Sequence, residues 1–204
     1  MTTTVFLVRH GQTEPNITGY YVGRSNEDMN ELGYAQVRNL SPRLAKLPIA
    51  SIYSSPLRRT MNTARLLAEP HKLEPVVLDD LIEIYLGDWQ GRHRDEISQK
   101  WPDIWQQSRI DPTDVTIPNG ESFQQVTGRA VRAFNRMVTE NAGQQALAVT
   151  HDVVIRVLAA HVLGTSNSIY RHMEINNASL TIIRVEDDRI RLVTLNDTAH
   201  LDGI

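Results

Sequence analysis

The feature that most constrains the fold is an apolar, β-branched run near the N-terminus, residues 3–8, which leads directly into Arg9, His10 and Gly11. Runs of this kind are typical of buried strands in an α/β sheet. In open α/β sheets ligands bind at the carboxyl ends of the strands, which is where Arg9 and His10 are expected. Gly11 has no Cβ, so the backbone can pass close to a bound group. A histidine at a strand end is more often a hydrogen-bonded structural residue, but the adjacent arginine favours chemistry on an anion.

A second histidine repeats this arrangement. Residues 146–150 predict another buried strand, His151 stands at its end, and a helix is expected to begin at Asp152. A helix N-terminus presents free N–H groups that favour anions. The sequence therefore places two histidines at two strand ends.

Two arginines follow a third predicted strand, residues 50–55. The next helix is expected to open at Pro56, because a proline in the first turn loses no hydrogen bond. Arg58 and Arg59 would then lie in that first turn. Exposure on the surface is the ordinary interpretation of such charges, and binding of a phosphate is the functional one.

One acid lies in an apolar setting, Glu83 between Ile82 and Ile84. Burial raises the pKa of a carboxylic acid, which suits a general acid near neutral pH. Taken alone, a single glutamate among hydrophobic residues is usually half-exposed on a strand.

These ordered motifs resemble the histidine phosphatase superfamily, the phosphoglycerate mutase-like group. The resemblance covers nearly the whole chain, from about residue 5 to residue 201. It rests on Arg-His-Gly-Gln-Thr at residues 9–13, Ser-Ser-Pro-Leu-Arg-Arg at 54–59, Glu83 with Gly-Asp-Trp-Gln-Gly at 87–91, and Val-Thr-His at 149–151. It implies a three-layer αβα fold with a mostly parallel central sheet flanked by helices, and a small helical cap insertion.

The resemblance also implies roles for single residues. His10 would be the nucleophile that becomes phosphorylated, and Glu83 would be the general acid. Arg9 and Arg59 would bind the phosphate, and a protonated His151 would hold one of its oxygens. The further candidate substrate contacts are Thr13, Asn16, Gly23, Asp152 and His200.

For two of these candidates, the role that the superfamily implies does not carry over directly to this chain. Asp152 stands where the superfamily usually has glycine, and its charge near a dianion opposes phosphate binding. We hypothesise that it pairs instead with an ammonium group of the substrate, which would suit phosphoserine. His200 lies in the C-terminal tail, where a surface position is the more common outcome.

We expect one domain over residues 1–204, with the cap segment around residues 92–120. Within the cap, Pro102 interrupts a pattern of helical spacing that runs from residue 94 to residue 107. The cap is short, and the chain ends at Ile204.

Two further local predictions concern secondary structure. A helix capped by Asn30 is expected to run toward Leu47, with a kink or a fresh start at Pro42. A hairpin with its turn at residues 186–188 is expected to close the sheet.

Composition excludes other classes. The net charge of −3 provides no basic field for nucleic acid or a membrane surface. The absence of cysteine excludes disulfides and thiol nucleophiles. We find no signal-peptide pattern and no run near the ~18 apolar residues of a membrane helix, so a cytoplasmic location is expected. The motifs of serine hydrolases and of P-loop kinases are missing from the sequence.

The expected activity is hydrolysis of a small phosphorylated metabolite, with no cofactor and no metal. Arginines would neutralise the phosphate dianion, and no Asp-x-Asp or His-x-His pair argues for a metal. Phosphoserine is the specific candidate substrate, and phosphoglycerate, sugar phosphates and α-ribazole phosphate compete with it.

Two alternative functions stay open. One is a 2,3-bisphosphoglycerate-dependent phosphoglycerate mutase, although such mutases have a longer insertion and tail. The other is a non-catalytic pseudo-phosphatase that binds phosphorylated ligands. Many members of the superfamily form homodimers, and nothing in this sequence decides whether this chain does.

Overall fold

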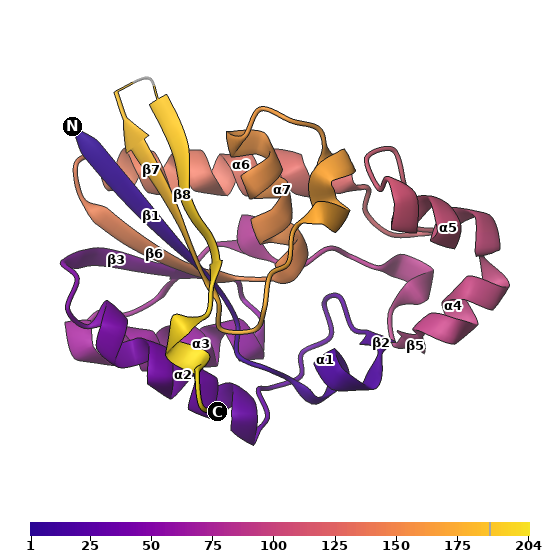
Figure 1. Cartoon of the computed structure of the whole chain (residues 1–204), viewed down its shortest axis with the longest axis horizontal. Helices are drawn as coiled ribbons and strands as arrows, with labels where there is room; N and C mark the ends of the chain where they lie inside the picture. Colours follow the sequence, from indigo (N-terminus) through magenta and orange to yellow (C-terminus); the bar gives the residue numbers. More distant parts are fainter. Residues whose placement is uncertain (188) are drawn as a thin grey trace.

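A six-stranded sheet with helices on both faces forms the body of the protein (Figure 1). The computed structural model describes residues 1–187 and 189–204, so Asp188 of the expected hairpin turn lies outside the described residues. The strand order is β4-β3-β6-β1-β7-β8, with β4, β3, β6 and β1 mutually parallel and β7 and β8 antiparallel at one edge. The strands are Thr2–Arg9 (β1), Ile49–Ser54 (β3), Val76–Val77 (β4), Gln145–Thr150 (β6), Leu180–Glu186 (β7) and Arg189–Asp197 (β8). The expected mostly parallel α/β sheet is confirmed.

Two long helices cover each face of this sheet (Figure 1). On one face lie α2 (Glu31–Leu44) and α3 (Arg58–Ala68), and on the other lie α6 (Phe123–Glu140) and α7 (Asp152–Val162). Short 3-10 turns join the elements: η1 (Glu69–His71), η2 (Asp79–Leu81), η3 (Gly87–Trp89), η4 (Asn167–His172) and η5 (Ala199–Leu201).

Alternate side chains of β1 face two separate cores. Val5 and Leu7 pack in the core that contains the apolar faces of α6 and α7, whereas Phe6 and Val8 pack with those of α2 and α3. Successive side chains of a strand point to opposite faces, and here both faces are buried. This is why residues 5–8 are apolar without alternation.

Two helix boundaries differ from the sequence predictions, and both involve proline. Helix α2 begins after Asn30, whose side chain accepts from the Gly33 N–H at 2.8 Å as expected, but it continues through Pro42 to Leu44 without a fresh start. A proline in the last turn removes only one intrahelical donor, so the helix tolerates it there. Pro56 does not open α3, which begins two residues later at Arg58.

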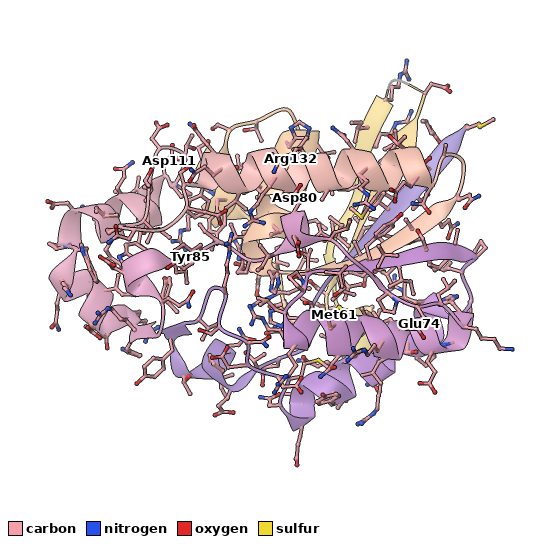
Figure 2. The ribbon with its side chains drawn as sticks, turned by 180° about the vertical axis from the view of Figure 1, so that it is seen from behind. Met61, Glu74, Asp80, Tyr85, Asp111 and Arg132 are labelled. Carbon is pink, nitrogen blue, oxygen red and sulfur yellow. The ribbon has the colours of Figure 1, made fainter. Side chains whose placement is uncertain are left out.

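A smaller unit lies beside the carboxyl ends of the parallel strands (Figure 1). It contains α1 (Glu14–Thr18), a two-stranded ladder of β2 (Tyr20–Tyr21) and β5 (Arg92–His93), α4 (Arg94–Lys100) and α5 (Pro102–Ile110). Pro102 begins α5, so the helical pattern is interrupted where the sequence predicted. Figure 2 shows Tyr85 and Asp111 at this end of the molecule and Glu74 at the other, with Asp80 beside Arg132 of α6. Among the described residues, every helix is too short or too polar to cross a membrane.

Candidate active site

The register of β1 and β6 brings the two strand-end histidines together. Arg9 pairs with Thr150, and the His10 N–H donates to the Thr150 carbonyl at 3.1 Å. The rings of His10 and His151 meet edge to face with their centroids 5.2 Å apart. Both side chains are buried at the carboxyl end of the sheet.

The surroundings of His10 fix its tautomer. Its Nδ1 lies 2.7 Å from the Gly11 carbonyl, which only accepts, so the proton is on Nδ1. The Nε of Arg59 donates to His10 Nε2 at 3.2 Å, which marks Nε2 as the unprotonated nitrogen. Burial and the charges of Arg59 and Arg9 lower the pKa of His10 well below 6.5. A neutral imidazole with a free Nε2 is the form that a nucleophile requires.

Arg59 is one of the largest buried side chains among the described residues. Its Nη1 donates to the Ser25 carbonyl at 2.6 Å and its Nη2 to the Gly23 carbonyl at 2.8 Å, while Glu27 lies 4.0 Å away. These bonds hold the guanidinium against His10. Gly23, a predicted substrate contact, thus positions Arg59 through its carbonyl and also lines the cavity.

Arg9 approaches the same histidine from β1. Its Nη1 donates to the Ile175 carbonyl at 2.5 Å, and its buried Nε has no hydrogen-bond partner among the described residues. The side chain lines the cavity, as does that of Arg59. The two arginines that the sequence predicted to bind the phosphate therefore line the same cavity as His10.

His151 is the N-cap residue of α7, and its Nε2 lies 2.8 Å from the Ser55 hydroxyl. Its buried Nδ1 has no partner within residues 1–187 and 189–204. Burial and the charges of Arg59, His10 and Arg9 lower its pKa well below 6.5. This lowered pKa favours the neutral ring in the absence of phosphate, and the protonated ring stays a prediction for the phosphate-bound site. A phosphate dianion beside it would oppose these charges and raise the pKa again.

Glu83 lies in the segment between η2 and η3 and lines the cavity. Its Oε1 accepts from the Ile84 N–H at 2.9 Å. Burial, and next the charge of Asp152, raise the pKa of this carboxyl above its usual range near 4.5. The carboxyl is thereby favoured in the protonated form that a general acid requires.

Asp152, at the start of α7, has its charge compensated by other side chains. Its Oδ1 accepts from Arg156 Nε at 2.9 Å and lies 3.9 Å from Arg9 Nη1, and its Oδ2 accepts from the Tyr170 hydroxyl at 3.3 Å. The opposition to phosphate binding that the sequence suggested is therefore reduced. Asp152 still lines the cavity, where it could contact a substrate.

The remaining predicted contacts divide into two groups. Asn16 lines the cavity, and its Oδ1 accepts from the Thr13 hydroxyl and from Asn177 Nδ2, each at 3.0 Å. Thr13 is buried beneath it and orients Asn16 without lining the cavity. His200 lies in η5, which packs on α2, and is not among the lining residues. The structure therefore does not bring His200 to the cavity with the other predicted residues.

Several residues of the site were not singled out in the sequence. Ser55 orients His151, and Asn177 donates to both the His10 carbonyl and Asn16. Arg109 of α5 and Arg171 of η4 line the outer end of the cavity. Ser55 lies within the matched Ser-Ser-Pro motif, which was the available signal, whereas no local pattern marks the two arginines.

The cavity connects the strand ends with the smaller unit and has a volume of about 720 Å³. Arg9, His10, Arg59 and Glu83 line its inner part. Tyr21, Trp89 and Trp105 pack edge to face at its side, with ring centroids 5.8–6.0 Å apart. Across residues 1–187 and 189–204, no three histidine or carboxylate side chains gather as a metal site would require.

The fold and these residues define an α/β protein in which His10 follows a strand and lies beside two arginines, Arg9 and Arg59. Residues 5–198 match the model of the histidine phosphatase superfamily, branch 1. The chain belongs to this superfamily, as the sequence motifs indicated.

Named relatives and a solved structure agree with this assignment. The chain is 33% identical over 197 residues to phosphoserine phosphatase 1 of Hydrogenobacter thermophilus, covering 97% of this chain and 93% of that protein. It is 30% identical to adenosylcobalamin/alpha-ribazole phosphatase of Salmonella typhimurium, covering 96% of each. The solved structure of Bacillus stearothermophilus YhfR superposes with a TM-score of 0.94 at 30% identity, over 98% of this chain and 100% of that one.

Proposed function

We propose that the protein hydrolyses small phosphomonoesters through a phosphohistidine formed on His10. The observation that carries this proposal is the state of His10, a neutral ring whose free Nε2 lies against the Arg59 guanidinium. Arg9 and Glu83 line the same cavity, and the pKa of the Glu83 carboxyl is raised. These two residues complete the set of groups that the reaction requires.

In the first step, His10 Nε2 attacks phosphorus and the ester P–O bond breaks. The leaving alkoxide takes the proton of the Glu83 carboxyl and departs as an alcohol. Arg9 and Arg59 donate to the equatorial oxygens, on which charge is spread in the transition state. The Nδ1 of His151 is available as a further donor.

In the second step, a water molecule attacks the phosphohistidine and the P–N bond breaks. Glu83, now a carboxylate, takes a proton from this water, and inorganic phosphate leaves. His10 and Glu83 return to their starting protonation states. We propose that residues 92–120 act as a cap that keeps bulk water away during the first step, because Arg94, Trp105 and Arg109 line the cavity from this segment.

Phosphoserine and α-ribazole phosphate are the first substrates to test, since relatives carry both names. Asp152 on the cavity wall supports phosphoserine, because a carboxylate there would pair with the ammonium group. An unchanged ratio of phosphoserine to phosphoglycolate turnover in Asp152→Gly would exclude this contact.

The decisive experiment measures phosphate release from L-phosphoserine, 3-phosphoglycerate, α-ribazole phosphate and an aryl phosphate in EDTA. The wild type should be active and should form an acid-labile phosphoenzyme, and His10→Ala should do neither. His161→Ala, which removes an exposed histidine of α7, is the matched control and should behave as wild type. Isomerisation of phosphoglycerate in the presence of 2,3-bisphosphoglycerate would indicate the mutase, and binding without turnover would indicate the pseudo-phosphatase.

A further inference from the structure

The outer end of the cavity carries a second group of cations. Arg94 of α4, Arg109 of α5 and Arg171 of η4 line it. These three residues are separate from Arg9 and Arg59, which belong to the inner end.

A backbone contact ties Arg171 to the segment that carries Arg109. The Nε and Nη2 of Arg171 donate to the Ser108 carbonyl at 3.2 and 2.9 Å, and Ser108 directly precedes Arg109. Each guanidinium also lies over an aromatic ring, Arg109 over Trp105 at 5.7 Å and Arg171 over Tyr170 at 5.3 Å. Both side chains line the same cavity.

Their charges act on each other and on Tyr21. Burial, and then the like charges of Arg109 and Arg156, lower the pKa of Arg171. All three outer arginines counter the effect of burial on the pKa of the Tyr21 hydroxyl, and Tyr21 lines the same cavity.

No carboxylate compensates Arg109 or Arg171. Among the residues that the structure describes, neither has an acidic oxygen within 4.0 Å. Asp152 is already paired with Arg156, and Asp95 is 3.7 Å from Arg94. Single exposed arginines are ordinary, but two adjacent and uncompensated ones on the wall of a substrate-sized cavity form a site for an anion.

We propose that Arg109 and Arg171 bind a second anionic group of the substrate, a carboxylate or another phosphate, at the end opposite the phosphate that His10 attacks. This inference rests on the proposed function and narrows its substrate class to phosphomonoesters with a distal anion. Guanidinium groups suit both anions because they can donate two parallel hydrogen bonds.

The test compares esters that differ only in the distal group. O-phosphoserine is paired with O-phosphoethanolamine, and 3-phosphoglycerate with glycerol 3-phosphate, so that each pair differs by one carboxylate. Fructose 1,6-bisphosphate and fructose 6-phosphate test a second phosphate. The wild type should prefer the anionic member of at least one pair.

Arg109→Gln and Arg171→Gln should each lower kcat/KM for that preferred ester about threefold to tenfold, mostly through KM, and leave its partner nearly unchanged. The matched control is Arg92→Gln, which removes a cap arginine that pairs with Glu96 and does not line the cavity. It should leave both esters unaffected. Equal losses on both members of a pair would overturn the proposal, since the arginines would then only support the cap.

A binding experiment separates this inference from the proposed reaction. Titration calorimetry with His10→Ala measures the affinity for 3-phosphoglycerate and glycerol 3-phosphate without turnover. If the wild type hydrolyses nothing but Arg109→Gln selectively weakens 3-phosphoglycerate binding, the anion site stands and the hydrolytic function fails. If no affinity difference exists between the two ligands, the anion site itself is wrong.

Discussion

The Nε of Arg59 donates to Nε2 of His10 across 3.2 Å, so a cation of α3 directly contacts the free nitrogen of a histidine that follows β1. The same guanidinium binds the carbonyls of Gly23 and Ser25. One side chain therefore joins the strand end, the helix start and the loop between α1 and α2.

Replacing Arg59 should remove stabilisation of the transition state. Replacing its neighbour Arg58 should have little effect on activity. Arg59→Ala is expected to lower kcat/KM by about 100-fold, because a buried charge-assisted donor is lost. Arg59→Lys should recover part of the loss, since it keeps the charge but not the planar fork. Arg58→Ala removes an exposed arginine of the same turn and should change kcat/KM less than about twofold. Thermal unfolding of each variant controls for misfolding.

The pH profile should depend on Asp152 through Glu83. Phosphorylation needs neutral His10 and protonated Glu83, so activity is lost on the acid side as His10 is protonated and on the alkaline side as Glu83 ionises. Asp152 raises the pKa of Glu83, and its removal lowers that pKa. Asp152→Asn should therefore move the alkaline limb of kcat/KM to lower pH.

Asp95→Asn is the control for this shift, because Asp95 lines the cavity but pairs with Arg94 at the outer end. Its alkaline limb should coincide with that of the wild type. An unmoved limb in Asp152→Asn would show that burial alone sets the protonation of Glu83.

Ser55 should act as a positioning residue for His151. Its hydroxyl lies 2.8 Å from His151 Nε2, and by donating to that nitrogen it would keep the ring proton on Nδ1. Ser55→Ala is expected to lower kcat about tenfold with little change in unfolding temperature, because one hydrogen bond to a donor ring is lost. Ser54→Ala, which removes a hydroxyl that donates to the Ser55 carbonyl, should cost less activity. Equal losses would indicate a general packing effect at the end of β3.

Position 23 should require glycine for two reasons, its positive φ and the lack of room for a Cβ. Its φ is +46°, and a Cβ would lie 2.9 Å from Leu86 Cγ and 3.0 Å from the Ile84 carbonyl oxygen. Gly23→Ala is expected to destabilise the fold by about 2 kcal/mol and to lower activity by displacing Arg59.

Gly91→Ala separates the two effects, since Gly91 has a φ of +76° but nothing within 4 Å of its Cβ position. It should be destabilising by about 1 kcal/mol without loss of kcat/KM. Urea unfolding measures both free energies. Similar activity losses in both variants would contradict a special role for the Gly23 carbonyl.

Local patterns predicted much of the fold. The apolar runs 3–8 and 146–150 indicated buried strands, and Asn30 correctly marked the start of α2. Pro42 and Pro56 were interpreted from local preference alone. The helix makes no fresh start at Pro42, and Pro56 lies before the helix that it was expected to open. Tertiary packing decides how far a helix extends, and a marginal local preference does not.

By itself, the sequence determined which residue types stand at the strand ends, and through them the superfamily and the candidates His10, Arg59, Glu83 and His151. The tertiary structure decided their acid–base properties, because burial and neighbouring charges lower the pKa of His151 and raise the pKa of Glu83. It also decided that His200 does not line the cavity and that Arg109 and Arg171, residues 62 positions apart in the chain, line it together. The physical reason is that desolvation and Coulomb interactions depend on distance in space, which spacing along the chain does not specify.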